Sequence, residues 1–313
     1  MTEPIVYLNG QFLAASQAHL AIYDAGVVLG ATVAEQTRTF HRRPWRLEEH
    51  LDRLLDSLRQ TRLDAGLSKD QWIAISRKLL DHNAALLEEH EELGLIQFVT
   101  AGEYPTYAGA SGAAARTGPT ICVHTFSLPF ELWARRMQSG ASLIVPRIRH
   151  VPPQCYDPSI KHRSRLHFFL ADQEARAAEP EAVALLLDID GYVTETSTAN
   201  FFMVEKGAIV SPTLRNILPG MSRAMVIELA AQLGIPFMER DFTPQEAARA
   251  DEAFLSSTPY CLMPATKING GRIGNGQPGP IYGRLLAAWS EAAGLDIARQ
   301  IEEGAAKKKN VTG

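Results

Sequence analysis

A chain of 313 residues, 46% hydrophobic and 21% charged, is long enough to bury a substantial core as two domains, and its composition argues against a disordered protein. The formal net charge is −4, so no excess of positive charge indicates nucleic-acid binding. No apolar run approaches the ~18 residues that a membrane-spanning helix needs, so we expect no membrane association.

The cysteines and the N-terminus both bear on the cellular compartment. Cys122, Cys155 and Cys261 are odd in number and widely spaced, which argues against a disulfide framework and against a zinc site. The first residues lack a basic region followed by an apolar stretch, so no signal peptide is expected. We therefore expect a soluble protein of the reducing cytoplasm, without a metal site.

The first 127 residues are predicted to form several strands and two long helices. The pair Asn9-Gly10 separates two short apolar runs and predicts a hairpin. Leucines spaced by three and four residues predict the first helix, and Ser68 is the expected N-cap of the second. The predicted strands are 5–8, 11–13, 27–40, 95–100 and 120–126, and the predicted helices are 47–58 and 69–91.

The remaining chain mixes strand hairpins and helices without a regular strand-helix repeat. Asp190-Gly191 and Lys206-Gly207 each predict a hairpin turn, and Gly234 is a signal for the end of a helix. This mixture favours an α+β fold over a doubly wound parallel sheet. The predicted elements are strands at 141–145, 182–188, 192–195, 200–204 and 208–211, helices at 166–178 and 222–233, and further elements at 244–249, 253–256 and 280–293.

The stretch Leu128-Pro129-Phe130 predicts a linker between two domains. No internal repeat or low-complexity tract indicates a further division. We expect a small N-terminal α+β domain over 1–127, a linker over 128–135, a larger C-terminal α+β domain over 136–300 and a tail over 301–313.

Two residues indicate a specific chemistry. Lys161 lies in a stretch rich in loop formers just before a helical run, and Glu195 lies in a stretch rich in threonine and serine. A lysine amine together with an acid that can hold a pyridinium nitrogen is what pyridoxal phosphate (PLP) chemistry requires. Most lysines are solvated surface charges, so further segments are needed to support this interpretation.

Six segments of the chain supply that support. They are Tyr7-Leu8-Asn9-Gly10, Glu49-His50-Leu51-Asp52-Arg53-Leu54, Ile160-Lys161, Thr194-Glu195-Thr196-Ser197-Thr198-Ala199-Asn200, Leu218-Pro219-Gly220-Met221-Ser222-Arg223 and Ser256-Ser257-Thr258. In order and spacing they resemble the class IV aminotransferases of fold type IV, which include branched-chain aminotransferases, D-amino-acid aminotransferases and 4-amino-4-deoxychorismate lyases. The resemblance covers roughly residues 5–295. It implies a two-domain α+β homodimer with PLP between the domains and small amino and keto acids as substrates.

The resemblance implies that Lys161 forms the Schiff base with PLP and moves a proton between the substrate Cα and the cofactor C4′. For this role the pKa of Lys161 must fall through burial or nearby positive charge, for which His162, Arg163 and Arg165 are candidates. Glu195 is expected to face the ring nitrogen through a charge-assisted hydrogen bond. Arg165 is a candidate for contacting the ring 3-hydroxyl or the substrate, and equally for a helix-surface charge.

The cofactor phosphate needs cations and amide donors. Met221 and Ser222 follow a Pro-Gly pair at the expected start of a helix, where N–H groups and the helix dipole favour an anion. In the family, the arginine of the Glu-His-x-x-Arg-Leu run, here Arg53, reaches the phosphate. Thr258 offers a hydroxyl and an N–H to the same group.

The strand at 33–39 resembles the substrate-pocket strand of the family. Glu35 and Arg38 are retained, whereas Ala34 replaces an aromatic residue and Gln36 replaces a glycine. Alternation along a strand puts Ala34, Gln36 and Arg38 on one face, which predicts a roomier and more polar pocket with Arg38 available for a carboxylate. The alternative is a structural Arg38 that pairs with an acid elsewhere.

The sequence predicts a class of substrate but no individual compound. Residues 100–107 lack the Arg-x-His element with which D-amino-acid aminotransferases bind the α-carboxylate, and the family threonine tied to elimination in the lyases falls at Gln36. Tyr104 is a further candidate pocket residue. We therefore expect a transaminase acting on a branched-chain-like L-amino acid and a keto acid such as 2-oxoglutarate. The alternatives are a D-amino-acid or (R)-amine transaminase and a 4-amino-4-deoxychorismate lyase, while retention of Lys161 and Glu195 argues against a noncatalytic PLP-binding relative.

Overall fold

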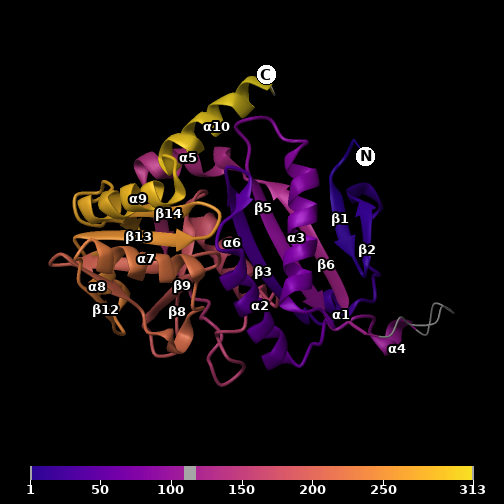
Figure 1. Ribbon diagram of the computed structural model, residues 1–313. Helices are drawn as coiled ribbons and strands as arrows, with labels where there is room; N and C mark the ends of the chain where they lie inside the picture. Colours follow the sequence, from indigo (N-terminus) through magenta and orange to yellow (C-terminus); the bar gives the residue numbers. More distant parts are fainter. Residues whose placement is uncertain (1, 109–117, 312–313) are drawn as a thin grey trace. The chain divides into compact units, whose positions relative to one another are not determined.

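The computed structural model of the protein describes residues 2–108 and 118–311 (Figure 1). The chain divides into two compact units. Unit 1 comprises residues 1–128 and 160–165, and unit 2 comprises residues 129–159 and 166–313. The short segment that contains Lys161 therefore belongs to unit 1, although the chain on both sides of it belongs to unit 2.

Unit 1 contains an antiparallel sheet with the strand order β2-β1-β6-β5-β3-β4. Its strands are β1 (Ile5–Leu8), β2 (Gln11–Ala14), β3 (Thr32–Phe40), β4 (Arg43–Pro44), β5 (Leu93–Thr100) and β6 (Thr120–Ser127). The turn between β1 and β2 passes through Asn9 and Gly10, both with positive φ, as the hairpin sequence predicts. Strand β3 pairs with β5 from Thr32 to Arg38, which defines the register of the predicted pocket strand.

Two amphipathic helices, α2 (Leu47–Thr61) and α3 (Lys69–Ala84), pack against this sheet. Their apolar faces meet the sheet in one core, whose fully buried members include Leu51, Leu54, Trp72, Leu79 and Leu95. Burial of each leucine side chain contributes roughly 1.5–3 kcal/mol, so this core fixes α2 against β3. Ser68 caps α3 as predicted, in a capping box with Gln71.

Unit 2 contains a larger sheet with the strand order β12-β11-β10-β13-β14-β7-β8-β9. Its strands are β7 (Ala141–Ile144), β8 (Val183–Leu187), β9 (Val193–Thr196), β10 (Asn200–Glu205), β11 (Ala208–Ser211), β12 (Phe237–Glu239), β13 (Glu252–Ser257) and β14 (Cys261–Ile268), with β15 (Gly271–Arg272) paired to β14. Strand β9 also pairs with β10, through Glu195 and Asn200, so the strands from β10 to β9 close into a ring.

The helices of unit 2 surround this ring of strands. They are α5 (Phe130–Ser139), α6 (Leu166–Ala178), α7 (Met221–Gln232), α8 (Pro244–Ala248), α9 (Pro280–Ala293) and α10 (Ile297–Val311), with a 3-10 helix at Leu214–Asn216. Helix α6 packs on β8, whereas α7 and α9 pack on β13. Within residues 2–108 and 118–311, no helix combines the length and the apolar character required to cross a bilayer.

The start of unit 1 differs from the sequence prediction. The strand predicted over 27–40 begins only at Thr32, because the preceding residues form the short helix α1 (Ala25–Val28). The Asp24 carboxylate stabilises α1 by accepting a hydrogen bond of 2.7 Å from the Gly26 N–H. A 3-10 helix at Ala15–Gln17 and the short helix α4 (Pro105–Ala108) are further elements that the periodicity did not predict.

The predicted linker and tail are largely helical. Helix α5 begins at Phe130, inside the stretch 128–135, and α10 covers most of 301–313, of which 312–313 lie outside the described residues. Phe130 of α5 and Ile301 of α10 are buried, which explains why these segments are ordered as helices. The predicted limits of the domains themselves stay a prediction.

Candidate active site

The lysine segment of unit 1 adds to the edge of strand β3. The Lys161 carbonyl accepts a hydrogen bond of 2.9 Å from the Ala34 N–H, and the Arg163 N–H donates to the Thr32 carbonyl at 2.9 Å. The Lys161 N–H donates to the Ser57 hydroxyl of α2 at 3.1 Å. These three contacts fix the backbone of the lysine against β3 and α2.

Glu35, the residue after Ala34 on β3, carries a buried carboxylate. Glu35 accepts two hydrogen bonds from Arg53, from Nε to Oε2 at 2.8 Å and from Nη2 to Oε1 at 2.7 Å, and His50 Nδ1 lies 3.0 Å from Oε1. His50 and Arg53 are three residues apart and therefore share one face of α2. The guanidinium of Arg53 is thus held in one orientation by a two-point contact.

The charges of this network follow from their surroundings. Burial by itself raises the pKa of Glu35, but Arg53 and His50 outweigh it and hold that pKa well below its usual range. Burial is the largest cause that lowers the pKa of His50, and Arg53 adds to it. Glu35 is therefore an anion, and the neutral His50 ring donates to it from Nδ1.

Lys161 itself is half-buried, and its environment disfavours the ammonium form. Burial lowers its pKa from 10.5 to about 8; Glu35 opposes the change, whereas Arg53, Arg165 and Arg163 add to it. At a pKa of about 8, roughly one amine in ten is uncharged at pH 7. The structure thus provides the lowered basicity that a reactive lysine amine needs.

The predicted substrate residues lie on or near the same unit 1 sheet. Arg38 is buried, with its Nε donating to the neighbouring backbone carbonyl at 3.1 Å and its guanidinium carbon 3.9 Å from the centre of the Phe40 ring. Gln36 is half-buried on β3. Tyr104 is half-buried before α4, with its ring edge-on to that of Tyr107 at 5.3 Å. Their roles toward a substrate stay predictions.

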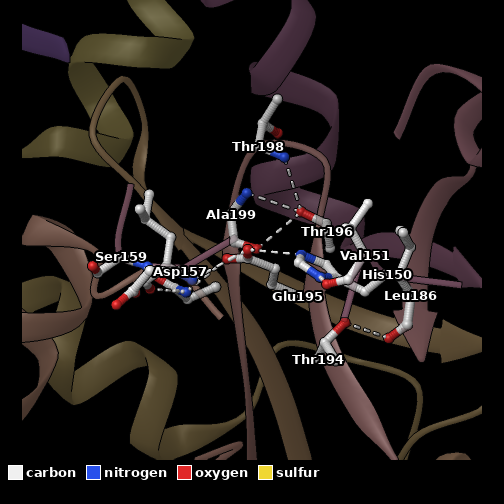
Figure 2. Close-up of polar contacts among 12 residues, drawn as sticks. His150, Val151, Asp157, Ser159, Leu186, Thr194, Glu195, Thr196, Thr198 and Ala199 are labelled. Carbon is white, nitrogen blue, oxygen red and sulfur yellow. Dashed lines mark hydrogen bonds and ion pairs between the residues drawn. The ribbon is translucent and has the colours of Figure 1, made fainter. Parts of the chain in front are cut away.

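In unit 2, two hydrogen bonds and one ion-pair contact surround the Glu195 carboxylate, and Figure 2 shows the His150 ring beside it. Asn200 Nδ2 donates to Oε2 at 3.0 Å, the Leu218 N–H donates to Oε1 at 3.2 Å, and His150 Nε2 lies 3.4 Å from Oε1. Each carboxylate oxygen has two lone pairs, so Oε2 can accept one further hydrogen bond.

The residues on either side of Glu195 are tied to backbone atoms (Figure 2). Thr194 donates its hydroxyl to the Leu186 carbonyl at 2.9 Å, and the Thr196 hydroxyl accepts from the Ala199 N–H at 2.9 Å. Strand β9 is therefore fixed at both neighbours of the acid.

Strand register brings other predicted cofactor residues to the same edge of the unit 2 sheet. Asn200 pairs with Glu195 of β9 and with Ser256 of β13. The end of β9, the start of β10 and the end of β13 therefore lie at one edge. Thr258, which is half-buried, follows β13 at that edge.

The start of α7 approaches this edge closely. Asn200 Nδ2 donates to the Leu218 carbonyl at 2.9 Å, and a Cβ added at Gly220 would lie only 2.1 Å from Asn200 Oδ1. Only glycine permits this approach. Met221 and Ser222 form the first turn of α7, where N–H groups have no acceptor within the helix and the dipole favours an anion.

Several contacting side chains have no role in the sequence prediction. Glu35 is identified there only as a retained residue, and His50, His150 and Asn200 have no assigned function. The spacing of His50 and Arg53 on one helix face could have predicted their common partner. His150 lies in no motif, so only the folded structure brings it to Glu195.

Comparison with known proteins identifies the family. The family model "Amino-transferase class IV" matches residues 32–268, more than half of the chain. This chain belongs to the class IV aminotransferases. These enzymes depend on PLP, so the predicted family and its cofactor are confirmed.

Curated relatives of this class IV aminotransferase are named either as branched-chain-amino-acid aminotransferases or as D-alanine aminotransferases. "Branched-chain-amino-acid aminotransferase-like protein 1" of Arabidopsis thaliana is 31% identical over 94% of this chain and 52% of its own length. A putative branched-chain-amino-acid aminotransferase of Methanocaldococcus jannaschii is 30% identical over 90% and 93%. D-alanine aminotransferase of Bacillus licheniformis is 29% identical over 95% and 99%. The chain spans about half the length of the plant relatives that it matches.

Solved structures support the fold. The branched-chain amino acid aminotransferase of Escherichia coli superposes with a TM-score of 0.83 at 24% identity, covering 92% of this chain and 94% of that one. The branched-chain aminotransferase of Thermoproteus uzoniensis gives a TM-score of 0.80 at 24% identity, covering 96% of each chain. The predicted two-domain α+β, fold-type IV architecture is confirmed.

The residues present fit PLP. Lys161 offers an amine with a pKa of about 8 for the aldehyde. Glu195 offers Oε2, which can accept one more hydrogen bond, for a ring N–H. The first turn of α7, which Gly220 allows to approach Asn200, offers N–H groups for a phosphate.

Proposed function

We propose that this chain is a PLP-dependent transaminase that exchanges an amino group between an amino acid and a keto acid such as 2-oxoglutarate. A branched-chain-like L-amino acid is the first choice of donor. Branched-chain names among the relatives, at 30% and 31% identity, support that choice. D-alanine aminotransferases at 29% identity support a D-amino acid as the second candidate.

The environment of Lys161 is the main support for catalysis. When bound, PLP supplies an aldehyde that condenses with amines and a ring that accepts the electron pair of a substrate Cα–H bond. Lys161 Nζ, partly uncharged near neutral pH, is the base that removes the proton from the substrate Cα. In its protonated form the same group returns a proton as a general acid.

Other residues are proposed to hold the cofactor. Glu195 accepts a hydrogen bond from the ring nitrogen, and Arg53 together with the N–H groups of Met221 and Ser222 holds the phosphate. The contact with Glu35 keeps the Arg53 guanidinium in one orientation, which supports its role as a fixed cation.

Thr258 and Arg165 are the remaining residues proposed to contact the cofactor or the substrate. Thr258 adds a hydroxyl donor for the phosphate. Arg165 lies in the lysine segment and contributes positive charge to the Lys161 environment, which supports a place near the ring 3-hydroxyl or the substrate.

Substrate recognition is assigned to Arg38, Gln36 and Tyr104. Arg38 and Gln36 share one face of β3 because side chains alternate along a strand. Arg38 is proposed to attract the substrate carboxylate. Substitution of Arg38 by Lys or Met would raise KM more than it lowers kcat if this assignment holds.

The lysine assignment is tested by trapping. Borohydride reduction of the PLP-loaded protein, followed by digestion and mass spectrometry, is expected to leave the pyridoxyl group on Lys161. Lys161→Ala is expected to lower transamination by about 10²–10⁴-fold, the usual contribution of general acid–base catalysis. Lys69→Ala, a change at a half-buried lysine paired with Asp52, is the control. Labelling at a different lysine contradicts the assignment.

The donor is tested with the PLP-loaded protein and a panel of L-amino acids, D-amino acids and (R)-amines. Loss of the visible absorption band with L-leucine and formation of pyridoxamine phosphate are expected. Reaction with D-alanine but not with L-leucine would overturn the first choice of donor. Release of pyruvate from 4-amino-4-deoxychorismate would instead identify a lyase.

A homodimer is also proposed. In unit 2, Leu166, Phe169 and Leu170 lie on one face of α6 and are 69%, 58% and 44% exposed. Such an apolar patch is typical of a subunit interface. Light scattering should give twice the chain mass of 34.4 kDa, and Phe169→Glu should shift the mass toward the monomer. A monomeric wild-type protein contradicts this proposal.

Residence in the cytoplasm is proposed from the cysteines. Cys122, Cys155 and Cys261 are free thiols, and burial raises the pKa of Cys122 to about 12. Such thiols suit a reducing compartment. Fractionation of the source cells, with recovery in the soluble cytoplasmic fraction, is the expected result.

A further inference from the structure

His150 is held in unit 2 by contacts on three sides. Its backbone N–H donates to the Leu187 carbonyl of β8 at 2.9 Å. Its ring packs edge-on against His167 and Phe168 of α6, with centroids 5.4 and 5.3 Å away. The residue is 6% exposed. Its ring therefore has a defined orientation, with Nδ1 in a hydrogen bond to a carbonyl oxygen and Nε2 at ion-pair distance from a carboxylate oxygen.

Each ring nitrogen of His150 lies near one oxygen atom. Nδ1 lies 3.0 Å from the Val151 carbonyl oxygen, and Nε2 lies 3.4 Å from Glu195 Oε1. A peptide carbonyl and a carboxylate can only accept hydrogen bonds. A neutral imidazole carries one proton and can satisfy one of them, whereas the imidazolium suits both.

We propose that His150 is a positioning residue that, protonated on both ring nitrogens, pairs with Glu195 Oε1 and turns Oε2 toward the pyridine nitrogen of the cofactor. This inference rests on the proposed role of Glu195 in binding the ring. His150 touches neither the substrate nor the reacting atoms in this account. It acts through the carboxylate.

The two oxygens of the Glu195 carboxylate have different neighbours, which supports different roles for them. Oε1 faces His150 and the Leu218 N–H, whereas Oε2 accepts one hydrogen bond from Asn200. The ionisable groups packed against the His150 ring include Glu195 from β9 and the second imidazole, His167, from α6.

The first experiment needs no cofactor. The chain contains nine histidines, and ¹⁵N-labelled histidine gives separate ring signals in long-range ¹H–¹⁵N spectra. The His150 signals are identified by their loss in His150→Gln. At pH 7 both nitrogens of His150 should have imidazolium shifts, and in Glu195→Gln the ring should become neutral. A neutral His150 in the wild-type chain overturns the proposal.

The second experiment measures PLP binding by three variants. His150→Phe keeps an aromatic ring without a donor and should weaken binding by about 10–100-fold, the contribution of a hydrogen bond to a charged group. His150→Gln restores a neutral donor and should recover most of that loss. His167→Phe, which keeps the aromatic packing around His150, should bind PLP as the wild type does. Circular dichroism confirms that each variant is folded.

The outcomes separate this inference from the proposed function. Equal affinity of His150→Phe and His167→Phe overturns the positioning role, and tighter binding by His150→Phe overturns it as well. If His150→Phe fails to fold, the positioning role is still tested by two results. These are the PLP affinity of His150→Gln relative to wild type and the protonation of His150. If the wild type binds no PLP at all while His150 is doubly protonated, the proposed function fails and the ion pair is structural.

Discussion

Lys161 lies near charges of both signs, and their balance sets its pKa. Burial and the three arginines 53, 163 and 165 disfavour the ammonium form, whereas Glu35 favours it. Glu35 also binds Arg53 directly, so one carboxylate influences both the lysine and a neighbouring cation. Removal of the Glu35 charge should therefore be visible at the lysine.

Glu35→Gln is predicted to lower the pKa of Lys161 further below about 8, because the variant loses an anion that raises it. It should also destabilise the chain by about 3–5 kcal/mol, because the buried Arg53 loses its charged partner. The rate of Lys161 acylation as a function of pH, measured by mass spectrometry on cofactor-free protein, gives the pKa.

The matched control for this prediction is Glu49→Gln. Glu49 is an exposed carboxylate on α2, the helix that carries Arg53, and it pairs with Arg46. Its removal should leave the pH dependence of Lys161 acylation unchanged, since exposed charges are screened by solvent. A rise in the pKa of Lys161 in Glu35→Gln contradicts the account of its environment.

Motifs in the sequence single out residues for the site, and the chemical roles of these residues stay predictions. The motifs single out Lys161, Glu195 and Arg53, and the structure gives each a buried or half-buried polar environment. Their neighbours were harder to predict. Glu35 and His150 reach Arg53 and Glu195 from distant parts of the sequence, and only the strand and helix packing brings them together.

At the scale of elements, the start of α7 depends on one close approach. Gly220 permits the backbone before α7 to lie against Asn200, which in turn orients Glu195. The geometry of the helix start and that of the acid are therefore linked through a single amide side chain.

Gly220→Ala is predicted to destabilise the chain by about 1–3 kcal/mol, because its Cβ would lie 2.1 Å from Asn200 Oδ1. Weaker PLP binding should accompany this change. Gly283→Ala on α9 is the matched control, since a Cβ there meets no atom within 4 Å and alanine favours a helix by about 1 kcal/mol. Thermal unfolding and PLP titration measure both variants. Equal effects of the two changes contradict the prediction.

Most elements follow from local pattern, and the exceptions have physical causes. Strand β14 contains Pro264, which opposes a strand assignment in the middle of a sheet, so the local pattern does not predict this strand. Helix α3 ends at Ala84, although the predicted helix continued to residue 91. The buried side chain of Asn83 binds the Ile5 backbone there, a distant contact that periodicity does not reveal.

At the scale of the whole molecule, the lowered pKa of Lys161 links stability to pH. The folded-state pKa, about 8, lies below the unfolded value of 10.5, so between these values the unfolded chain binds the proton more readily. The free energy of unfolding should therefore rise as pH increases from 8 to 10.5. The shift corresponds to about 3 kcal/mol at most.

Urea unfolding of cofactor-free wild type and Lys161→Met at several pH values measures this contribution. Wild type should gain stability relative to Lys161→Met between pH 8 and 10. Lys69→Met is the control, because Asp52 raises the pKa of that lysine and no gain is expected. A constant difference between wild type and Lys161→Met over this range rules out the lowered pKa.

The return of residues 160–165 to unit 1 also affects how such chains can evolve. A recombination event at residue 128 would join the N-terminal segment of one gene to the remainder of another. The hybrid would combine Lys161 of one parent with the Ala34 and Ser57 partners of the other. Selection should therefore favour inheritance of the lysine segment and the first 128 residues from one parent, even though some thirty codons separate them.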